Sequence, residues 1–127
     1  MMYDPKAFAP AFIFGRNYFL ILKAESTTVG RDSLPVLGMA LELADAKDNR
    51  TRRYVNVFKN QDPHGSFAKF GEAFIAANPE FSNGFNEADL IGRTGAANFW
   101  LKDNFLQVNN WAFDMPAPQL PNQGGEL

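Results

Sequence analysis

Alternation between large apolar residues and small or polar ones in the segment 37–43 (LGMALEL) constrains the fold of this chain most strongly. Because successive side chains of a strand point to opposite faces, this period of two predicts a β-strand with one buried face. The opposite face carries Gly38 and Ala40. These small residues leave room for a neighbouring backbone, an aromatic ring or a ligand base.

The segment 50–59 (RTRRYVNVFK) combines the densest positive charge in the sequence with β-branched and aromatic residues, which predicts a second strand. A polar hairpin loop at residues 45–49 leads into it. One face of this strand would carry Arg52, Tyr54, Asn56 and Phe58, and the other Arg53, Val55, Val57 and Lys59. The valines suit a core, whereas the first face is polar and aromatic. The alternative is that another element covers both aromatic rings.

Three further strands are expected from their β-type patterns, at residues 16–25, 92–101 and 105–111. Unbroken alternation in the first of them places Lys23 on the face of Phe19 and Ile21. In the last strand, the same rule places Trp111 on the face of Gln107. Turn-rich connections are expected at residues 26–33 and 102–104.

The period changes to that of a helix between the third and fourth strands. Asp62 is expected as the N-cap, with Pro63 in the first turn. The helix is expected to end near Asn78, because the residue before Pro79 is disfavoured in helical geometry. Apolar residues recur at helical spacing between these points, at Phe67, Phe70, Phe74 and Ala77. Residues 80–92 are expected to form an acidic loop.

The resulting order of three strands, one helix and two strands predicts a mainly β protein. It fits an OB-fold-like, five-stranded, partly open Greek-key barrel with the helix between strands 3 and 4. The phenylalanines of the helix would then close one end of the barrel. We expect an aromatic N-terminal arm at residues 1–15, the barrel domain at residues 16–112, and a flexible tail rich in proline and glycine at residues 113–127.

The composition limits the classes of function. The 127 residues carry a net charge of −2 and include no cysteine, which excludes disulfides, thiolate metal sites and cysteine nucleophiles. This fits a reducing compartment, and we expect the cytoplasm, with neither a membrane span nor a secretion signal. Residues 16–59 hold eight Lys and Arg against five Asp and Glu. This modestly basic region suits a localised binding surface for a negatively charged partner.

Signals for an enzyme are weak, and we predict no catalytic residues, no metal and no cofactor. His64 is the only histidine, and one histidine without cysteine gives no metal cluster. The pair Gly92 and Gly95 lacks the lysine and the strand–turn–helix setting of a phosphate loop. Acidic residues at Glu80, Glu87 and Asp89 are more typical of a solvated loop than of a divalent-ion site.

A strand that presents arginine, aromatic rings and an amide has the chemistry of a single-stranded nucleic-acid site, where rings stack on bases and cations contact phosphates. Trp100 lies on the face opposite Phe99 and Leu101, so it is exposed if those two are core. Trp111 is a weaker candidate, since the alternative is that it closes the barrel. The full set of predicted nucleic-acid-binding residues is Arg16, Arg31, Arg50, Arg52, Arg53, Tyr54, Phe58, Lys59, Trp100 and Lys102.

Four parts of the sequence resemble a group of phage OB-fold proteins from replication or recombination gene clusters. They are Gly15-Arg16-Asn17-Tyr18, Leu41-Glu42-Leu43, Arg52-Arg53-Tyr54 and Asp89-Leu90-Ile91-Gly92-Arg93. The likeness covers roughly residues 13–112, and members with an assigned role bind single-stranded DNA. Proteins of this function commonly end in a strongly acidic tail that recruits partners. Residues 119–127 hold one acidic residue, so we do not expect recruitment through the tail.

We therefore expect sequence-independent binding of single-stranded DNA in phage DNA replication or recombination. Replication or recombination proteins and further copies of this chain are additional candidate partners. The alternative is a protein-interaction or virion-assembly module on the same small β-barrel, in which the N-terminal arm and the tail contact partners.

Overall fold

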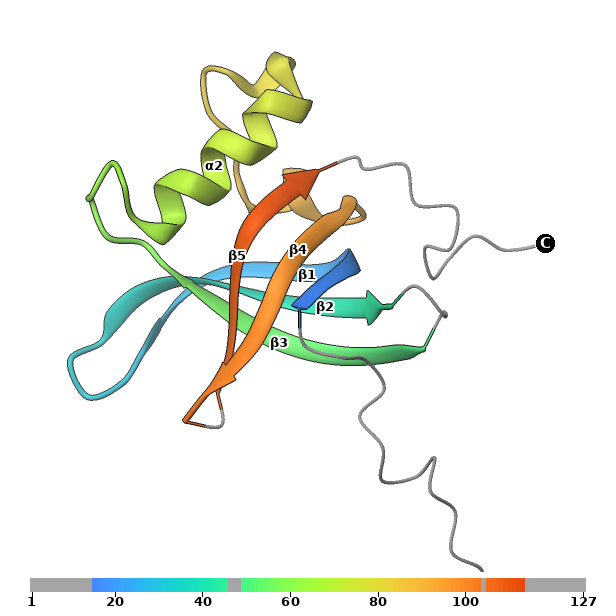
Figure 1. Ribbon diagram of the computed structural model, residues 1–127. Helices are drawn as coiled ribbons and strands as arrows, with labels where there is room; N and C mark the ends of the chain where they lie inside the picture. The colour runs from blue at the N-terminus through green and yellow to red at the C-terminus, as the bar shows by residue number, and fades with distance from the viewer. Residues whose placement is uncertain (1–14, 46–48, 104, 114–127) are drawn as a thin grey trace, which may run out of the picture.

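The computed structural model describes residues 15–45, 49–103 and 105–113. They form β1 (Gly15–Val29), β2 (Leu34–Ala44), β3 (Arg50–Phe58), α2 (Ser66–Ala77), the 3-10 helices η1 (Pro79–Phe81) and η2 (Glu87–Leu90), β4 (Thr94–Lys102) and β5 (Phe105–Phe113) (Figure 1). The predicted mainly β class, with one helix between the third and fourth strands, is confirmed. The predicted arm and tail fall almost entirely outside the described residues.

The five strands form one antiparallel sheet in the order β3-β2-β1-β4-β5. β1 joins its two halves, because residues 15–20 pair with β4 while residues 18–29 pair with β2. The sheet curls so that the β4–β5 hairpin crosses the β1–β2–β3 layer (Figure 1). β3 and β5 remain its two edges, and no ladder joins them within the described part of the chain. The result is a small barrel-like sheet that is not closed.

A β-bulge interrupts β1. Its register against β2 shifts between Ile21 and Lys23, so Leu22 is the additional residue. Phe19 and Ile21 are fully buried, but beyond the bulge Ala24 packs against the core and Lys23 is exposed. The expectation of unbroken alternation, with Lys23 on the inner face, is therefore wrong. The strand also runs four residues further than expected, which shortens the connection before β2 to a tight turn.

A second bulge reverses the predicted orientation of Trp111. The register of β4 against β5 shifts between Ala96 and Asn98, and Asn110 adopts a left-handed conformation with φ of 54°. Asparagine tolerates this conformation better than most residues. Trp111 consequently turns to the inner side, where it is 9% exposed, while Gln107 stays on the outer side. The expectation that these two share a face is wrong.

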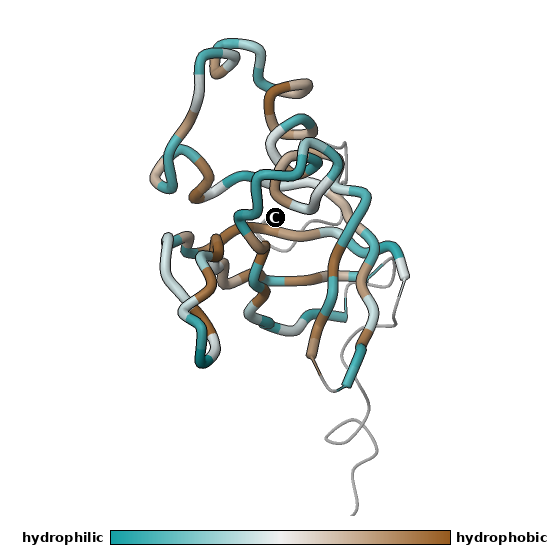
Figure 2. The backbone as a smooth tube through the Cα atoms, turned by 90° about the vertical axis from the view of Figure 1, so that its left-hand side faces the viewer, coloured by the Kyte–Doolittle hydropathy of each residue, from teal (hydrophilic) through white to brown (hydrophobic). Residues whose placement is uncertain are grey.

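The helix α2 lies over one end of the curled sheet and supplies aromatic side chains to its core (Figure 1). Phe70 packs edge-to-face on Trp111 with ring centroids 4.8 Å apart, and Phe74 packs on Phe113 at 5.2 Å. Such aromatic pairs stabilise a core beyond the area they bury. Hydrophobic and hydrophilic residues are interspersed along the strands (Figure 2), and the core contains buried residues of all five strands together with those of α2.

The start of the helix differs from the prediction. Gly65 is the N-cap, and no side chain caps the helix. Asp62 instead organises the preceding turn: its carbonyl accepts the N–H of Gly65 at 2.9 Å and its carboxylate accepts the N–H of His64. Pro63 lies in that turn rather than in the helix. The predicted end is confirmed, since the helix stops at Ala77.

The predicted acidic loop contains η1 and η2. Its segment from Asp89 to Arg93 links the loop to the helix. Asp89 and Asn86 form a capping box. The Arg93 guanidinium donates to the Asp89 carbonyl and to the Asn78 side chain, and it lies 5.5 Å from the centroid of the Phe74 ring. These residues therefore tie the segment after α2 to the helix. Among the described residues, no helix has the length and apolarity to cross a membrane.

Candidate nucleic-acid interface

The two faces of β3 differ as its sequence pattern predicts. Val55 and Val57 are 1% and 3% exposed and belong to the core. Tyr54 and Phe58 are 49% and 44% exposed, and Asn56 between them is also exposed. The alternative in which another element covers both rings does not hold. β3 therefore presents two aromatic rings and an amide on one open face, with its valines filling the barrel.

Tyr54 does not project freely but lies across β2. It pairs with Ala40 in the β2–β3 register, and its hydroxyl reaches β1, where it donates to the Glu25 carboxylate at 2.9 Å. On the way it passes over Gly38, where a Cβ would lie only 2.8 Å from the Cζ atom of the ring. The expectation that small residues of β2 leave room for an aromatic ring is confirmed. Burial raises the pKa of Tyr54, and the hydrogen bond to Glu25 and its negative charge raise it further.

Cationic side chains accompany these rings on the same face of the sheet. Arg52 pairs with Glu42 in register, and its guanidinium lies 4.0 Å from that carboxylate while the arginine side chain stays 76% exposed. A surface pair of this kind contributes at most about 1 kcal/mol, so the guanidinium can reorient toward a phosphate at little cost. Lys23, exposed opposite Ala40, adds a positive charge from β1.

Two predicted phosphate contacts, Arg53 and Lys59, do not belong to this face. Arg53 alternates with Arg52 and lies on the side of Val55 and Val57, at the exposed end of the strand. The Lys59 ammonium donates to the Ser26 hydroxyl and lies 5.7 Å from the centroid of the Phe67 ring. The structure therefore separates both residues from the ring-bearing face of β3.

Ser26 extends the interactions of Lys59 to the segment after the helix. Its hydroxyl donates to the Glu87 carboxylate. This hydrogen bond is the main reason that the pKa of Glu87 lies below its ordinary value, with contributions from the Glu87 backbone N–H and the charge of Lys59. The network joins β1, the end of β3 and η2, which is a structural role.

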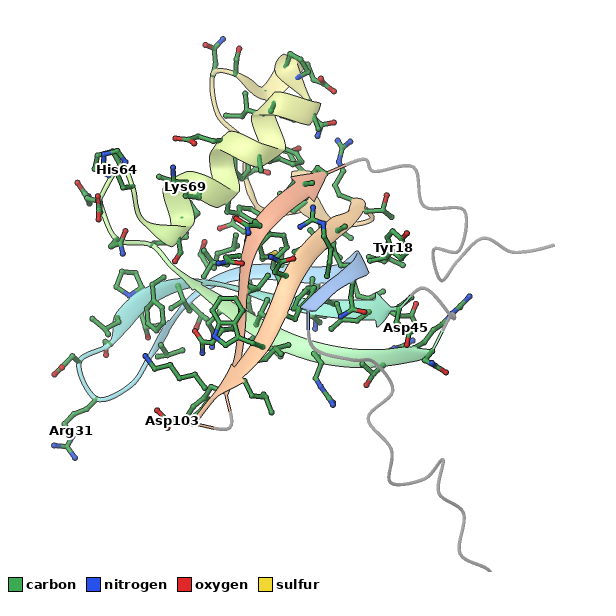
Figure 3. The ribbon with its side chains drawn as sticks, in the orientation of Figure 1. Tyr18, Arg31, Asp45, His64, Lys69 and Asp103 are labelled. Carbon is green, nitrogen blue, oxygen red and sulfur yellow. The ribbon has the colours of Figure 1, made fainter. Side chains whose placement is uncertain are left out.

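Arg16 and Arg31 lie at two separate places. Arg16 is on the first half of β1, where its guanidinium donates to the Asn110 carbonyl at 2.9 Å and to the Asn98 side chain at 3.3 Å. It thereby braces the bulge of β5. Arg31 is exposed in the turn between β1 and β2 and points away from the body of the protein (Figure 3). Of these two arginines, Arg31 extends into solvent, whereas Arg16 is engaged in hydrogen bonds at the bulge of β5.

Trp100 and Lys102 belong to the β4–β5 hairpin. Trp100 is 38% exposed opposite Gln107, and Lys102 lies opposite Phe105, which is 71% exposed. In the order of the sheet, β2 and β1 separate β4 from β3. Figure 3 marks the tips of the β1–β2 and β4–β5 hairpins by Arg31 and Asp103, and both project to the lower left of that view. The candidate interface thus has one strand face and two hairpin tips.

Arg50, the remaining predicted residue, is exposed at the start of β3 on the face of Arg52. His64 is exposed in the loop before α2. No group of three or more histidine, cysteine, aspartate or glutamate residues suited to a metal ion occurs in residues 15–45, 49–103 and 105–113. The amides Gln107 and Asn109 of β5 are not among the residues predicted from the sequence. Their alternation with apolar residues along the strand could have indicated a shared polar face.

Neither models of known protein families nor curated proteins match this chain. A function can therefore be proposed only from the geometry of the candidate interface.

Proposed function

We propose that this protein binds single-stranded DNA without sequence preference and holds it during phage DNA replication or recombination. The observation that carries the proposal is the outer face of β3, where Tyr54 and Phe58 are each more than 40% exposed beside Arg52 while the valines of the same strand are buried. Exposed rings beside cations form the combination that non-specific single-strand binding requires.

The spacing of the rings suits an extended strand of nucleotides. Tyr54 and Phe58 are four residues apart on one face of β3, which separates their Cα atoms by about 13 Å. A stacked base contributes about 1–3 kcal/mol per ring. Trp100 on the β4–β5 hairpin supplies a third ring. In OB-folds, the face of strands 2 and 3 and the loops β1–β2 and β4–β5 are where oligonucleotides bind.

The charge of the site favours a modest electrostatic contribution. Arg50, Arg52 and Lys23 lie on the same face as the two acids Glu25 and Glu42. With three or four phosphate contacts, the slope of log K against log salt concentration is expected to be about −2 to −3 for a single strand. Stacking therefore supplies most of the affinity, which explains how a protein of net charge −2 holds a polyanion.

A fluorescence anisotropy titration with a labelled oligo-dT, a duplex of the same length and an RNA oligonucleotide tests the proposal at two salt concentrations. We expect the single strand to bind more tightly than the duplex. The variant Tyr54→Ala/Phe58→Ala should weaken binding at least tenfold. Ile91→Ala, which removes an apolar side chain 51% exposed elsewhere, is the matched control and should bind like the wild type. Equal binding by all three proteins would refute the proposal.

A second function, as a protein-interaction or virion-assembly module, is favoured by the tip of the β4–β5 hairpin. Phe105 and Trp100 are 71% and 38% exposed on one face of the hairpin, and exposed apolar side chains that lie close together mark interaction surfaces. This function requires a stable oligomer and no binding of DNA. Sedimentation of Phe105→Ser and of a chain lacking residues 1–14 distinguishes it, because an assembly module would dissociate while a DNA-binding protein would retain its affinity.

A further inference from the structure

The open seam of the sheet, between the edge strands β3 and β5, contains a cavity beside the strand-face interface. β3 and β5 are edges that no ladder joins in the described residues, and the first half of α2 lies beside them. Between these three elements is a cavity of about 570 Å³. Ligand sites commonly have volumes of about 300–1,000 Å³, so this cavity is large enough for a small molecule or for one unit of a polymer.

The walls of the cavity differ in chemistry. Its inner wall includes Val57 and Trp111, which belong to the core. Phe70 and Phe19 pack edge-to-face with the indole of Trp111, with ring centroids 4.8 and 5.1 Å away, and Phe113 is stacked with it at 6.1 Å. Trp111 is 9% exposed, so this wall offers a small apolar contact that the surrounding aromatic rings hold in position.

The strands that border the cavity contribute amides, at Asn56 of β3 and at Gln107 and Asn109 of β5. Each amide carries both a donor and an acceptor, the combination that matches the edge of a nucleobase. Lys69 lines the side formed by α2, and His64 lies on the loop before the helix (Figure 3). An ammonium group there suits a phosphate, while Glu72 further along α2 disfavours an anion at the other end.

The cavity is continuous with the strand face. Asn56 and Phe58 line the cavity and also lie on the outer face of β3 with Tyr54. A strand of DNA that runs along β3 therefore passes the mouth of the cavity at Phe58.

We propose that the seam cavity accepts a single unstacked nucleotide of the bound strand, with its base against Trp111 and the amides and its phosphate at Lys69. This inference rests on the proposed DNA binding. It adds one position at which a base is enclosed rather than stacked on an open ring. Occupancy of the cavity therefore adds the contacts of one base to those made on the open rings of β3.

A cavity-filling variant tests the inference without altering the outer face of β3. Ala73 is on the side of α2 that lines the cavity, so the side chain added in Ala73→Trp should exclude the base. Oligo-dT binding should weaken about tenfold, which corresponds to the loss of one base contact. Ala76→Trp adds the same side chain at an exposed position of the same helix and is the matched control. Thermal unfolding identifies any loss of folding in Ala73→Trp. Lys69→Gln/Asn109→Ala removes polar contacts without added volume and should weaken binding by a similar factor.

A direct readout comes from the two tryptophans. In Trp100→Phe, Trp111 is the remaining tryptophan, and its fluorescence should change on titration with dTMP but not with inorganic phosphate. Addition of Ala73→Trp would obscure this signal, so Lys69→Gln/Asn109→Ala is combined with Trp100→Phe instead and should abolish the change. Either unchanged Trp111 fluorescence on titration with dTMP or unchanged oligo-dT affinity of Ala73→Trp overturns the inference.

The outcomes separate the two proposals. A wild-type protein that does not bind oligo-dT refutes the function itself. A wild-type protein that binds, with affinity unaffected by Ala73→Trp, leaves the strand-face interface standing and rejects only the cavity. Loss of self-association in Ala73→Trp at unchanged DNA affinity would assign the cavity to a second copy of the chain, which also rejects the nucleotide.

Discussion

Gly38→Ala should change the stability of the protein in opposite directions depending on whether Tyr54 is present. A Cβ at Gly38 would lie 2.8 Å from Cζ of the Tyr54 ring and closer still to its hydroxyl. Ordinary carbon contacts are about 3.5–4.0 Å, so the end of the ring must move by roughly 1 Å. The hydrogen bond to Glu25, 2.9 Å in the structure, would then exceed the usual limit of about 3.2 Å.

The magnitude follows from two opposing contributions. Loss of the Tyr54–Glu25 hydrogen bond and of the contact over β2 costs about 1.5–2 kcal/mol. Alanine in place of glycine within a strand gains about 0.5–1 kcal/mol, since glycine loses more conformational freedom on folding. We therefore expect Gly38→Ala to destabilise the wild type by about 1 kcal/mol. In the Tyr54→Ala background the same substitution should stabilise by about 0.5–1 kcal/mol.

Urea unfolding of the four proteins of this double-mutant cycle gives both values. An ultraviolet titration provides a second readout, because the pKa of Tyr54 is raised by burial and by Glu25 and should fall toward its ordinary value in Gly38→Ala. The raised pKa means that this contribution to stability is complete below about pH 10 and lost as pH rises through the folded-state pKa. If Gly38→Ala changed the free energy of unfolding equally with and without Tyr54, the position of the Tyr54 ring over Gly38 of β2 would be refuted.

Three further predictions use other parts of the fold. Arg52→Ala should reduce the salt slope of oligo-dT binding by about 0.7, whereas Arg53→Ala, the same change on the opposite face, should leave it unaltered; equal slopes would contradict the assignment of faces. The lowered pKa of Glu87 stabilises the folded protein above pH 4.5, and this contribution is lost as pH falls through the lower folded-state pKa. The stability of Glu87→Gln should therefore fall less steeply as the pH is lowered. An unchanged dependence of stability on pH would contradict a stabilising role for the hydrogen bond between Ser26 and Glu87. Arg93→Ala should destabilise by about 1.5–3 kcal/mol in urea, with little rescue by Arg93→Lys, because lysine cannot make both hydrogen bonds; full rescue would show that charge alone matters.

Local periodicity was sufficient for much of the fold. The alternation in residues 37–43 and 50–59 predicted β2 and β3, and the valines of β3 are buried as expected. The phenylalanine stripe and Pro79 predicted the helix and its end. The pattern also placed Tyr54 and Phe58 on the outer face of β3. These features depend on strand and helix geometry within a few residues, which a sequence contains directly.

The inward turn of Trp111 and the exposure of Lys23 could not be predicted in this way. Both follow from bulges, one in β1 and one in β5, and a bulge changes the face of the later residues of its strand. The start of the helix was also missed, because the Asp62-Pro63 signal occurs in a turn that closes just before it. Each of these depends on neighbouring elements rather than on local preference.

For the candidate site, the sequence by itself determined which residue types could stack on bases and contact phosphates. Tertiary structure decided which residues of different strands share a surface. Lys23 of β1 lies on the same face as Tyr54, whereas Lys59 is held by Ser26 and Trp100 is on β4, which β2 and β1 separate from β3. It also formed the seam cavity from β3, β5 and α2. The physical reason is that side-chain direction along a strand is a local property, while proximity between strands is fixed by the register and curvature of the whole sheet.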